Sequence, residues 1–221
     1  MLNIVMEDDK KLIVYKKAGQ LSQSGKSFDL DLVSEVMAYR RKKGEPPYAA
    51  IINRLDRPVA GLVLMAKDKK EAARLSALMQ KSTFNKQYYA IVCGKPDANE
   101  GVLVDYLLKD GKENVSKVVN ADVAGAKRAE LKYQVIGELR EQTDKGCGLF
   151  LVDIHLITGR HHQIRVQFAS RELPLLGDVK YGGKPYDETV RKYIGRNQIA
   201  LCASSLTVDG KTYTVRPDWM N

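Results

Sequence analysis

Residues 54–66 read Arg54-Leu55-Asp56-Arg57-Pro58-Val59-Ala60-Gly61-Leu62-Val63-Leu64-Met65-Ala66, a charged turn followed at once by an apolar run. The apolar run predicts a buried β-strand over 62–66. Asp56 lies between two guanidinium side chains, and an opposite charge within a few Å favours the ionised form of a carboxylate. An ionised carboxylate in a cleft can act as a covalent nucleophile. Asp56 is therefore a candidate catalytic residue, although an ordinary ion pair in a surface turn would produce the same tetrapeptide.

The rest of the chain contains many strand-like segments and few helix-like ones. Alternating or short apolar runs between turn signals predict strands, and an apolar spacing of about 3.6 residues predicts helices. The pattern predicts an α+β fold with a mixed, largely antiparallel central sheet flanked by helices and loops. No change of composition marks a linker, so we expect a single domain over residues 1–221. The expected strands are 12–15, 49–52, 62–66, 86–93, 129–136, 149–156 and 199–208, the expected helices are 28–43, one capped by Asp68 and one starting near His161, and 97–125 is expected to form a hairpin or an extended loop.

The composition is that of a basic protein. Among 221 residues, 36 are Lys or Arg and 27 are Asp or Glu, which gives a net charge of +9. Basic side chains neutralise phosphates and release counterions, so a nucleic-acid partner is favoured, although a merely soluble basic protein fits equally well. Three widely spaced cysteines argue against a disulfide framework and a zinc site. We expect a cytoplasmic protein without a membrane partner, because no signal peptide or apolar run of ~18 residues is present.

A tyrosine follows in the strand-like segment Lys86-Gln87-Tyr88-Tyr89-Ala90-Ile91-Val92. Strand alternation places Tyr88 on one face and Tyr89 on the other. An inward-facing tyrosine could stack on a nucleobase, an interaction worth about 1–3 kcal/mol. From this segment alone, a tyrosine of the hydrophobic core is the better interpretation.

A third segment reads Thr158-Gly159-Arg160-His161-His162-Gln163-Ile164-Arg165. The glycine and the start of a helix predict an anion-accepting end, reinforced by Arg160. Arg165 lies about one turn into that helix, away from its apolar side, and could be the buried partner of Asp56. The two histidines lack a spaced third ligand and, as neighbours on a helix, should point in different directions, so no metal is expected.

Taken together and in order, four motifs resemble the pseudouridine synthases of the RluA/RsuA-like group. That family's pattern contains Arg-Leu-Asp with an apolar run ending in Ala-Lys, Lys-x-Tyr-x-Ala-x-Val, Thr-Gly-Arg-x-His-Gln-Ile-Arg-Val and Gly-Asp-x-x-Tyr-Gly. The matching segments here are 54–67, 86–92, 158–166 and 177–182. The resemblance covers nearly the whole chain and is weakest over 94–129. His161 stands where threonine is common, and Gln167 stands where histidine is common.

The resemblance implies an isomerase that converts specific uridines of structured RNA, ribosomal or transfer, to pseudouridine without a cofactor or metal. It implies that Asp56 is the catalytic aspartate, that Tyr88 stacks on the target base and that Arg165 is the basic partner of Asp56. The N-glycosidic bond would be broken and the base rotated and rejoined through carbon 5, after the base is flipped out of the RNA. The residues expected to bind substrate are Arg54, Arg57, Arg160, His162 and Gln163.

Two other functions stay open at this point. A homologue that binds or folds RNA without catalysis would need none of the three catalytic residues. A glycosidase would need a second carboxylate facing Asp56, and Asp178 could supply it, although we expect Asp178 to fix the turn at 177–182. The residues do not name the RNA or the uridine, nor whether Asp56 attacks the sugar or the base or assists departure of uracil. We expect a monomer without the small RNA-binding domain common at the amino terminus of this family.

Overall fold

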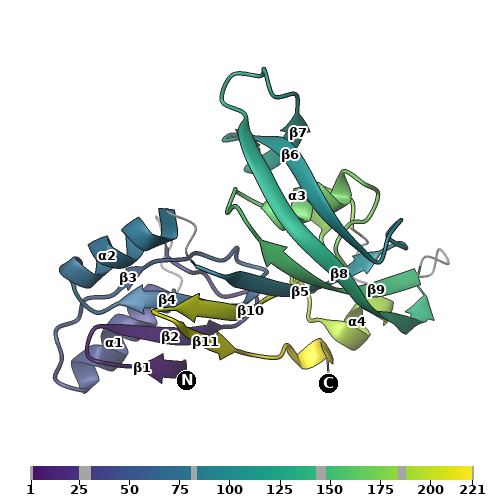
Figure 1. Ribbon diagram of the computed structural model, residues 1–221. Helices are drawn as coiled ribbons and strands as arrows, with labels where there is room; N and C mark the ends of the chain where they lie inside the picture. The colour runs from purple at the N-terminus through teal and green to yellow at the C-terminus, as the bar shows by residue number, and fades with distance from the viewer. Residues whose placement is uncertain (1, 25–30, 81–83, 143–147, 184–187, 221) are drawn as a thin grey trace. The chain divides into compact units, whose positions relative to one another are not determined.

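The computed structural model describes residues 2–24, 31–80, 84–142, 148–183 and 188–220 (Figure 1). They form two compact units: unit 1 consists of Met1–Phe84 and Ala203–Arg216, and unit 2 consists of Asn85–Cys202 and Pro217–Asn221. The fold is α+β, with a mixed, mostly antiparallel sheet and few helices. The predicted fold class is therefore confirmed.

The sheet of unit 1 is built around the apolar run that follows Asp56. In the order of hydrogen bonding, β1 (Asn3–Glu7), β2 (Lys11–Lys16), β4 (Ala60–Ala66) and β10 (Leu201–Val208, from Ala203 onward in this unit) lie side by side. The short β3 (Ala50–Ile51) pairs with β4, and β11 (Lys211–Thr214) pairs with β10. Every residue of β4 is buried, which explains why this strand reads as a continuous apolar run.

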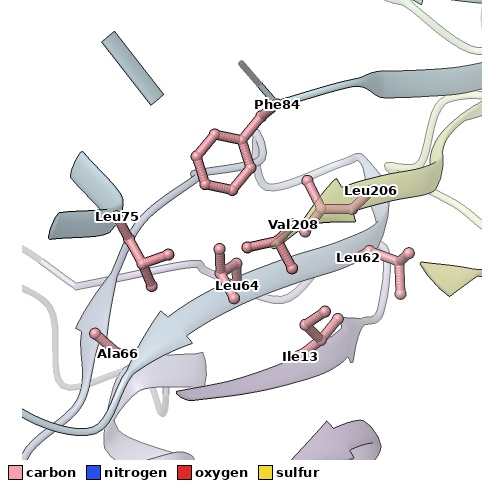
Figure 2. Close-up of a cluster of buried hydrophobic side chains, with 8 residues drawn as sticks. All are labelled: Ile13, Leu62, Leu64, Ala66, Leu75, Phe84, Leu206 and Val208. Carbon is pink, nitrogen blue, oxygen red and sulfur yellow. The ribbon is translucent and has the colours of Figure 1, made fainter. Parts of the chain in front are cut away.

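Two helices complete unit 1. Helix α1 (Leu32–Lys42) begins after Asp31, whose Oδ1 accepts a hydrogen bond from the Ser34 amide at 2.7 Å. Helix α2 (Lys69–Gln80) follows the predicted cap, because Asp68 Oδ1 accepts from the Glu71 amide at 2.8 Å. Part of the predicted helix, 28–30, lies outside the described residues. One side of α2 packs on the sheet, and Figure 2 shows the cluster that results: Ile13, Leu62, Leu64, Ala66, Leu75, Phe84, Leu206 and Val208.

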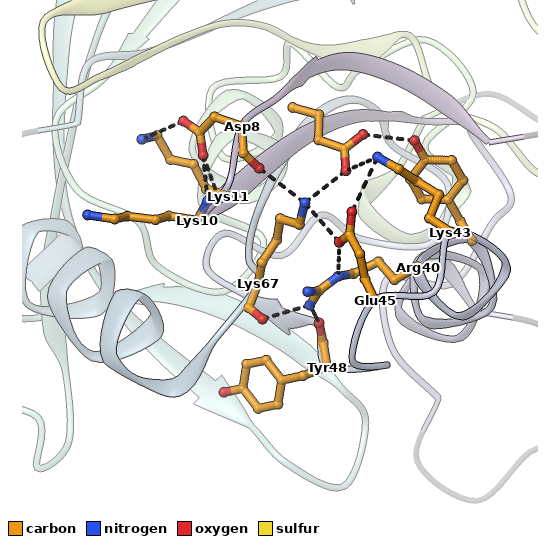
Figure 3. A network of polar contacts seen from close by, with 10 residues as sticks. Asp8, Lys10, Lys11, Arg40, Lys43, Glu45, Tyr48 and Lys67 are labelled. Atoms are coloured by element: carbon orange, nitrogen blue, oxygen red, sulfur yellow. Dashed lines mark hydrogen bonds and ion pairs between the residues drawn. The ribbon is translucent and has the colours of Figure 1, made fainter.

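A network of charges joins the end of α1 to the β1–β2 turn and to the end of β4 (Figure 3). The buried ammonium of Lys67 lies 2.9 Å from a carboxylate oxygen of Glu7 and 2.9 Å from one of Glu45. Arg40 Nε also pairs with Glu45 at 3.0 Å, and Lys43 pairs with both carboxylates. Hydrogen bonds from these cations outweigh desolvation and lower the pKa of Glu45 to about 2.

Unit 2 contains an antiparallel sheet in the order β5, β9, β8, β6, β7. Its strands are β5 (Lys86–Cys93), β6 (Glu100–Asp110), β7 (Val115–Val119), β8 (Lys127–Gln142) and β9 (Gly148–Leu156). The β6–β7 hairpin confirms the expectation for 97–125. The α-helices α3 (Gln163–Ala169) and α4 (Glu188–Tyr193) and the 3-10 helices η1 (Val179–Tyr181) and η2 (Asp218–Met220) belong to the same unit.

A glycine allows two strands of unit 1 to lie against each other. Gly61 has a φ of +128°, and a Cβ built on it would lie 2.4 Å from backbone atoms of Ala203 in β10. No side chain fits at that distance, so the glycine directly after the Asp56 loop is required by the close approach of β4 and β10.

Candidate functional site

The Asp56 loop connects β3 to β4 and is fixed from within unit 1. Its half-buried aspartate follows the buried Leu55, whose amide and carbonyl both bond to the hydroxyl of Ser22, at 3.2 and 2.6 Å. The Val59 amide donates to the Asp56 carbonyl at 3.1 Å and closes the turn. These bonds hold the backbone on both sides of the carboxylate.

Asn53 fixes the start of the same loop. Its side-chain nitrogen donates to the Leu62 carbonyl at 3.0 Å, and its side-chain oxygen accepts from the Leu64 amide at 2.7 Å. The side-chain amide of Asn53 thus bonds to Leu62 and Leu64 of β4 in the way that the backbone of a neighbouring strand would. The loop therefore leaves the sheet at a defined position directly before Arg54.

A fully buried lysine at the end of β2 lies beside the Asp56 loop. The ammonium of Lys16 donates to the carbonyls of Lys17 at 3.0 Å, Gln20 at 2.8 Å and Arg57 at 3.2 Å. Burial lowers the pKa of Lys16 to about 8, and the negative charge of Asp56 opposes this shift. Lys16 was not among the residues predicted from the sequence, although a lysine that ends an apolar strand was the available signal.

The two arginines that flank Asp56 in sequence are exposed. Arg57 Nε donates to the Gly19 carbonyl at 3.0 Å, and the Arg57 carbonyl accepts from the Gly19 amide at 2.7 Å. These bonds join the loop to the segment after β2. Exposed guanidinium groups beside a half-buried carboxylate form a surface to which a polyanion could bind.

In unit 2, Tyr88 lies near the start of β5 opposite Ile154 of β9, and the residue is 8% exposed. Lys86 shares its face of the strand by alternation. The Lys86 ammonium lies 3.5 Å from where a Cβ on Gly159 would be, so this face of β5 is next to the 158–163 loop. Burial lowers the pKa of Lys86.

Arg165 on α3 forms a buried two-bond pair with Asp178. Arg165 Nε lies 2.7 Å from Oδ2 and Nη2 lies 2.8 Å from Oδ1, and the two side chains are 6% and 1% exposed. The expectation for Asp178 was therefore incomplete: its backbone carbonyl closes the turn by accepting from the Tyr181 and Gly183 amides, while its carboxylate holds Arg165. The pairing of Arg165 with Asp56 stays a prediction.

The 158–163 loop is tied to β8 by the side chain of Gln163. Its Oε1 accepts from the Thr158 hydroxyl at 2.8 Å and from the Arg160 amide at 3.0 Å, and its Nε2 donates to the Glu130 carbonyl at 3.0 Å. Since Gln163 is 3% exposed, its observed contacts are structural. The Arg160 amide therefore donates within the protein. Exposed Arg160 also donates from Nε to the Arg128 carbonyl at 2.9 Å.

The two histidines differ from expectation. The helix begins at Gln163, and the rings of His161 and His162 stack with centroids 3.7 Å apart and planes 24° apart. The expectation that they point in different directions was wrong, because His162 has a φ of +53° and turns the chain before the helix starts. Among the residues that the structure describes, no group of three or more His, Cys, Asp or Glu side chains could hold a metal ion. Within the same residues, no helix is long and apolar enough to span a membrane.

Comparison with known proteins identifies a family that matches most of the chain. Residues 10–170 match the family described as RNA pseudouridylate synthase. The chain is 30% identical over 211 residues to ribosomal large subunit pseudouridine synthase C of Rickettsia prowazekii (strain Madrid E), covering 94% of this chain and 65% of that protein. It is 32% identical over 184 residues to ribosomal large subunit pseudouridine synthase D of Vibrio cholerae serotype O1 (strain ATCC 39315 / El Tor Inaba N16961), covering 83% and 53%.

The chain thus spans between about half and two thirds of the length of these curated relatives. Among solved structures, human RNA pseudouridylate synthase domain containing 4 superimposes with a TM-score of 0.76 at 22% identity, over 97% of this chain and 88% of that one. Human RNA pseudouridylate synthase domain containing 1 gives a TM-score of 0.73 at 21% identity, over 99% and 84%. Both share the fold of this chain.

Proposed function

Because the chain belongs to the RNA pseudouridylate synthase family, we propose that it is an isomerase that converts specific uridines of structured RNA to pseudouridine. The observation that carries the proposal is the family match over residues 10–170, a range that contains Asp56, Tyr88 and Arg165. Since the relatives are named for the large ribosomal subunit, we propose ribosomal RNA as the first substrate to test.

The proposed reaction conserves all atoms of the nucleotide. The bond from N1 of uracil to C1′ of the ribose breaks, the base rotates, and a bond forms between carbon 5 and C1′. Carbon 5 then loses its proton and N1 gains one, so no oxidant, reductant or cofactor is consumed. The base must leave the RNA stack for this chemistry and be held while detached.

In this proposal Asp56 reacts with the sugar or the base, or assists the departure of uracil. This assignment is supported by the loop that carries Asp56. Ser22 and Asn53 hold the backbone of the loop on one side, and β4 holds it on the other. The buried Lys16 places a positive charge near the carboxylate and fixes the carbonyl of Arg57. A nucleophile held in one position avoids the entropic cost of finding its target.

Tyr88 and Arg165 have the two supporting roles in unit 2. We assign stacking on the uracil to Tyr88, and we assign to Arg165 the role of basic partner of Asp56. The pair with Asp178 uses Nε and Nη2 of Arg165 and so fixes the plane of its guanidinium group. The proposal therefore assigns one reaction to residues of both units, which act together as one catalytic domain.

The proposed contacts with the RNA backbone are those of exposed cations. Arg54, Arg57 and Arg160 are exposed, and the net charge of the chain is +9. Guanidinium groups suit phosphate oxygens because they present paired N–H donors. His162 and Gln163 are proposed to shape the loop that receives the substrate. We further propose a cytoplasmic monomer, and light scattering on the purified protein measures its mass against the 24.7 kDa of one chain.

Asp178 does not supply the second carboxylate that a glycosidase would need. Asp178 is 1% exposed and both of its carboxylate oxygens bond to Arg165. A general acid must reach the leaving group, and the carboxylate of Asp178 is buried with both oxygens against Arg165. A measurement of pseudouridine formation distinguishes the isomerase from a homologue that binds RNA without catalysis.

The test treats RNA from cells that lack this protein with the purified protein and maps pseudouridines in ribosomal and transfer RNA separately. A new pseudouridine in ribosomal RNA supports the proposal and identifies the target. A new site in transfer RNA alone keeps the activity and changes the substrate. No new site in either class, with RNA binding still measurable, would favour the non-catalytic homologue.

A further inference from the structure

The hydroxyl group of Tyr181, in η1, is a junction between elements of unit 2. The backbone amide of Ser116 in β7 donates to it at 2.7 Å, and Nδ1 of His162 lies 2.7 Å from it. The ring of the same tyrosine faces Arg165, with the guanidinium carbon 5.1 Å from the ring centroid. One side chain therefore contacts the β6–β7 hairpin, the residue before α3 and the arginine of α3.

Two side chains, those of Asp178 and Tyr181, contact the guanidinium group of Arg165. The carboxylate of Asp178 bonds to Nε and Nη2 in the plane of the guanidinium group. The ring of Tyr181 contacts it as a cation–π partner. The carboxylate and the aromatic ring are therefore two separate contacts that hold the guanidinium group.

His162 links the same junction to the start of α3. Its φ of +53° is uncommon for a residue other than glycine and persists only where the surroundings hold it. Here the ring stacks on His161 and bonds to the Tyr181 hydroxyl. Since the His162 carbonyl accepts from the Val166 amide at 3.0 Å, the conformation of His162 sets the direction of the helix that carries Arg165.

The β6–β7 hairpin supports the stacked histidines through Ser116. The Ser116 hydroxyl donates to the His161 carbonyl at 2.9 Å and lies 2.9 Å from its Nδ1. His161 Nε2 also lies 3.2 Å from Oδ1 of Asn114 in the hairpin turn. The start of β7 thus holds His161 directly and His162 through Tyr181.

We propose that Tyr181 is a positioning residue for Arg165, and that its hydroxyl group couples the β6–β7 hairpin to the placement of this arginine. Tyr181 belongs neither to the proposed catalytic residues nor to the proposed substrate-binding ones. The coupling stands on the contacts of unit 2, and only its effect on turnover rests on the proposed function.

The direct test measures Arg165 itself by NMR of the arginine Nε–H groups. The Arg165 cross-peak is assigned by its loss in Arg165→Lys. Tyr181→Phe keeps the ring and removes the hydroxyl, so the cross-peak should shift or broaden. Tyr106→Phe is the matched control, because this half-buried tyrosine of β6 has no side-chain hydrogen bond to the described residues, and it should leave the cross-peak in place.

A second variant, at His162, removes the other partner of the contact with the Tyr181 hydroxyl. His162→Gly adopts the positive φ without strain and removes the ring that bonds to the Tyr181 hydroxyl. It should move the Arg165 cross-peak as Tyr181→Phe does. An unmoved cross-peak in both variants would overturn the proposal, whatever their activity.

Turnover supplies the functional readout. A misplaced catalytic group costs about 10- to 100-fold in rate, so Tyr181→Phe should lower kcat by about that factor and leave KM within about twofold. Tyr181→Leu, which also removes the ring, should lower kcat further. A raised KM with unchanged kcat would make Tyr181 an RNA contact and overturn the positioning role. If the unaltered protein forms no pseudouridine, the proposed function fails, and the NMR result still decides the coupling.

Discussion

Breaking the pair between Arg165 and Asp178 should destabilise unit 2 strongly, and removing both partners should restore much of the loss. Arg165 and Asp178 are 6% and 1% exposed, so each single replacement leaves one buried charge without its partner. Removing one partner of a buried pair costs about 3–5 kcal/mol, and replacing the whole pair with apolar side chains is often neutral. We therefore expect about 4 kcal/mol lost in Asp178→Leu, a similar loss in Arg165→Met, and less than either in the double variant.

The assay is urea unfolding followed by the fluorescence of Trp219. This residue is the single tryptophan of the sequence, belongs to unit 2 and packs against the buried cluster that contains Ile91. With a slope of about 2 kcal/mol per molar urea, a loss of about 4 kcal/mol lowers the midpoint by about 2 M. As a control, Glu130→Gln removes a more exposed pair with Arg128 and should cost less than about 1 kcal/mol.

Two results would refute this reasoning. A double variant whose loss equals the sum of the two single losses would mean that the charges do not depend on each other. An Asp178→Leu midpoint equal to that of the unaltered protein would mean that Arg165 tolerates the loss of its partner, and that Asp178 does not hold it.

The remaining predictions concern unit 1. Gly61→Ala should lower stability by about 3 kcal/mol or more, because the new Cβ meets the backbone of Ala203 at a positive φ; an unchanged melting temperature would contradict this. The pKa of Lys16 is about 8 when folded, below its unfolded value, so protonation costs stability below pH 8 and the cost disappears as pH rises toward 10.5. Between those pH values, the free energy of unfolding of the unaltered protein, measured by urea titration, should rise by up to about 3 kcal/mol relative to that of Lys16→Met. Parallel pH curves for the two proteins would argue against a destabilising buried charge. The pKa of Glu45 is lowered to about 2, so its contribution is present above its unfolded pKa of 4.5 and is lost as pH falls toward 2; Glu45→Gln should flatten the acid part of a circular-dichroism pH titration, and an unaltered acid transition would exclude this network as its cause.

Local patterns in the sequence were sufficient for most of the elements around the candidate site. The apolar run after Asp56 became β4, the alternation around Tyr88 became β5, and Asp68 caps α2 as predicted. Each of these signals depends on residues close together in the chain. Strand β1 and helix α4 were missed because each is short, with five and six residues, and carries little periodicity.

The contacts that were missed depend on how the chain folds back on itself rather than on a local pattern. The pair of Arg165 with Asp178 depends on how η1 returns to α3, and no local pattern encodes that return. The stacking of His161 and His162 depends on one backbone angle and on support from Ser116, 45 residues earlier than His161. The sequence therefore supplied the candidate residues, which stay predictions, while their contacts required the structure.

Release of tritium from RNA labelled at carbon 5 of uridine measures most directly whether Asp56 carries out the proposed isomerisation. Asp56→Asn should release none above background while binding the RNA and unfolding as the unaltered protein does. Asp122→Asn, which changes an exposed aspartate in the same way, should keep full activity. Tritium release by Asp56→Asn at a rate near that of the unaltered protein would contradict the account.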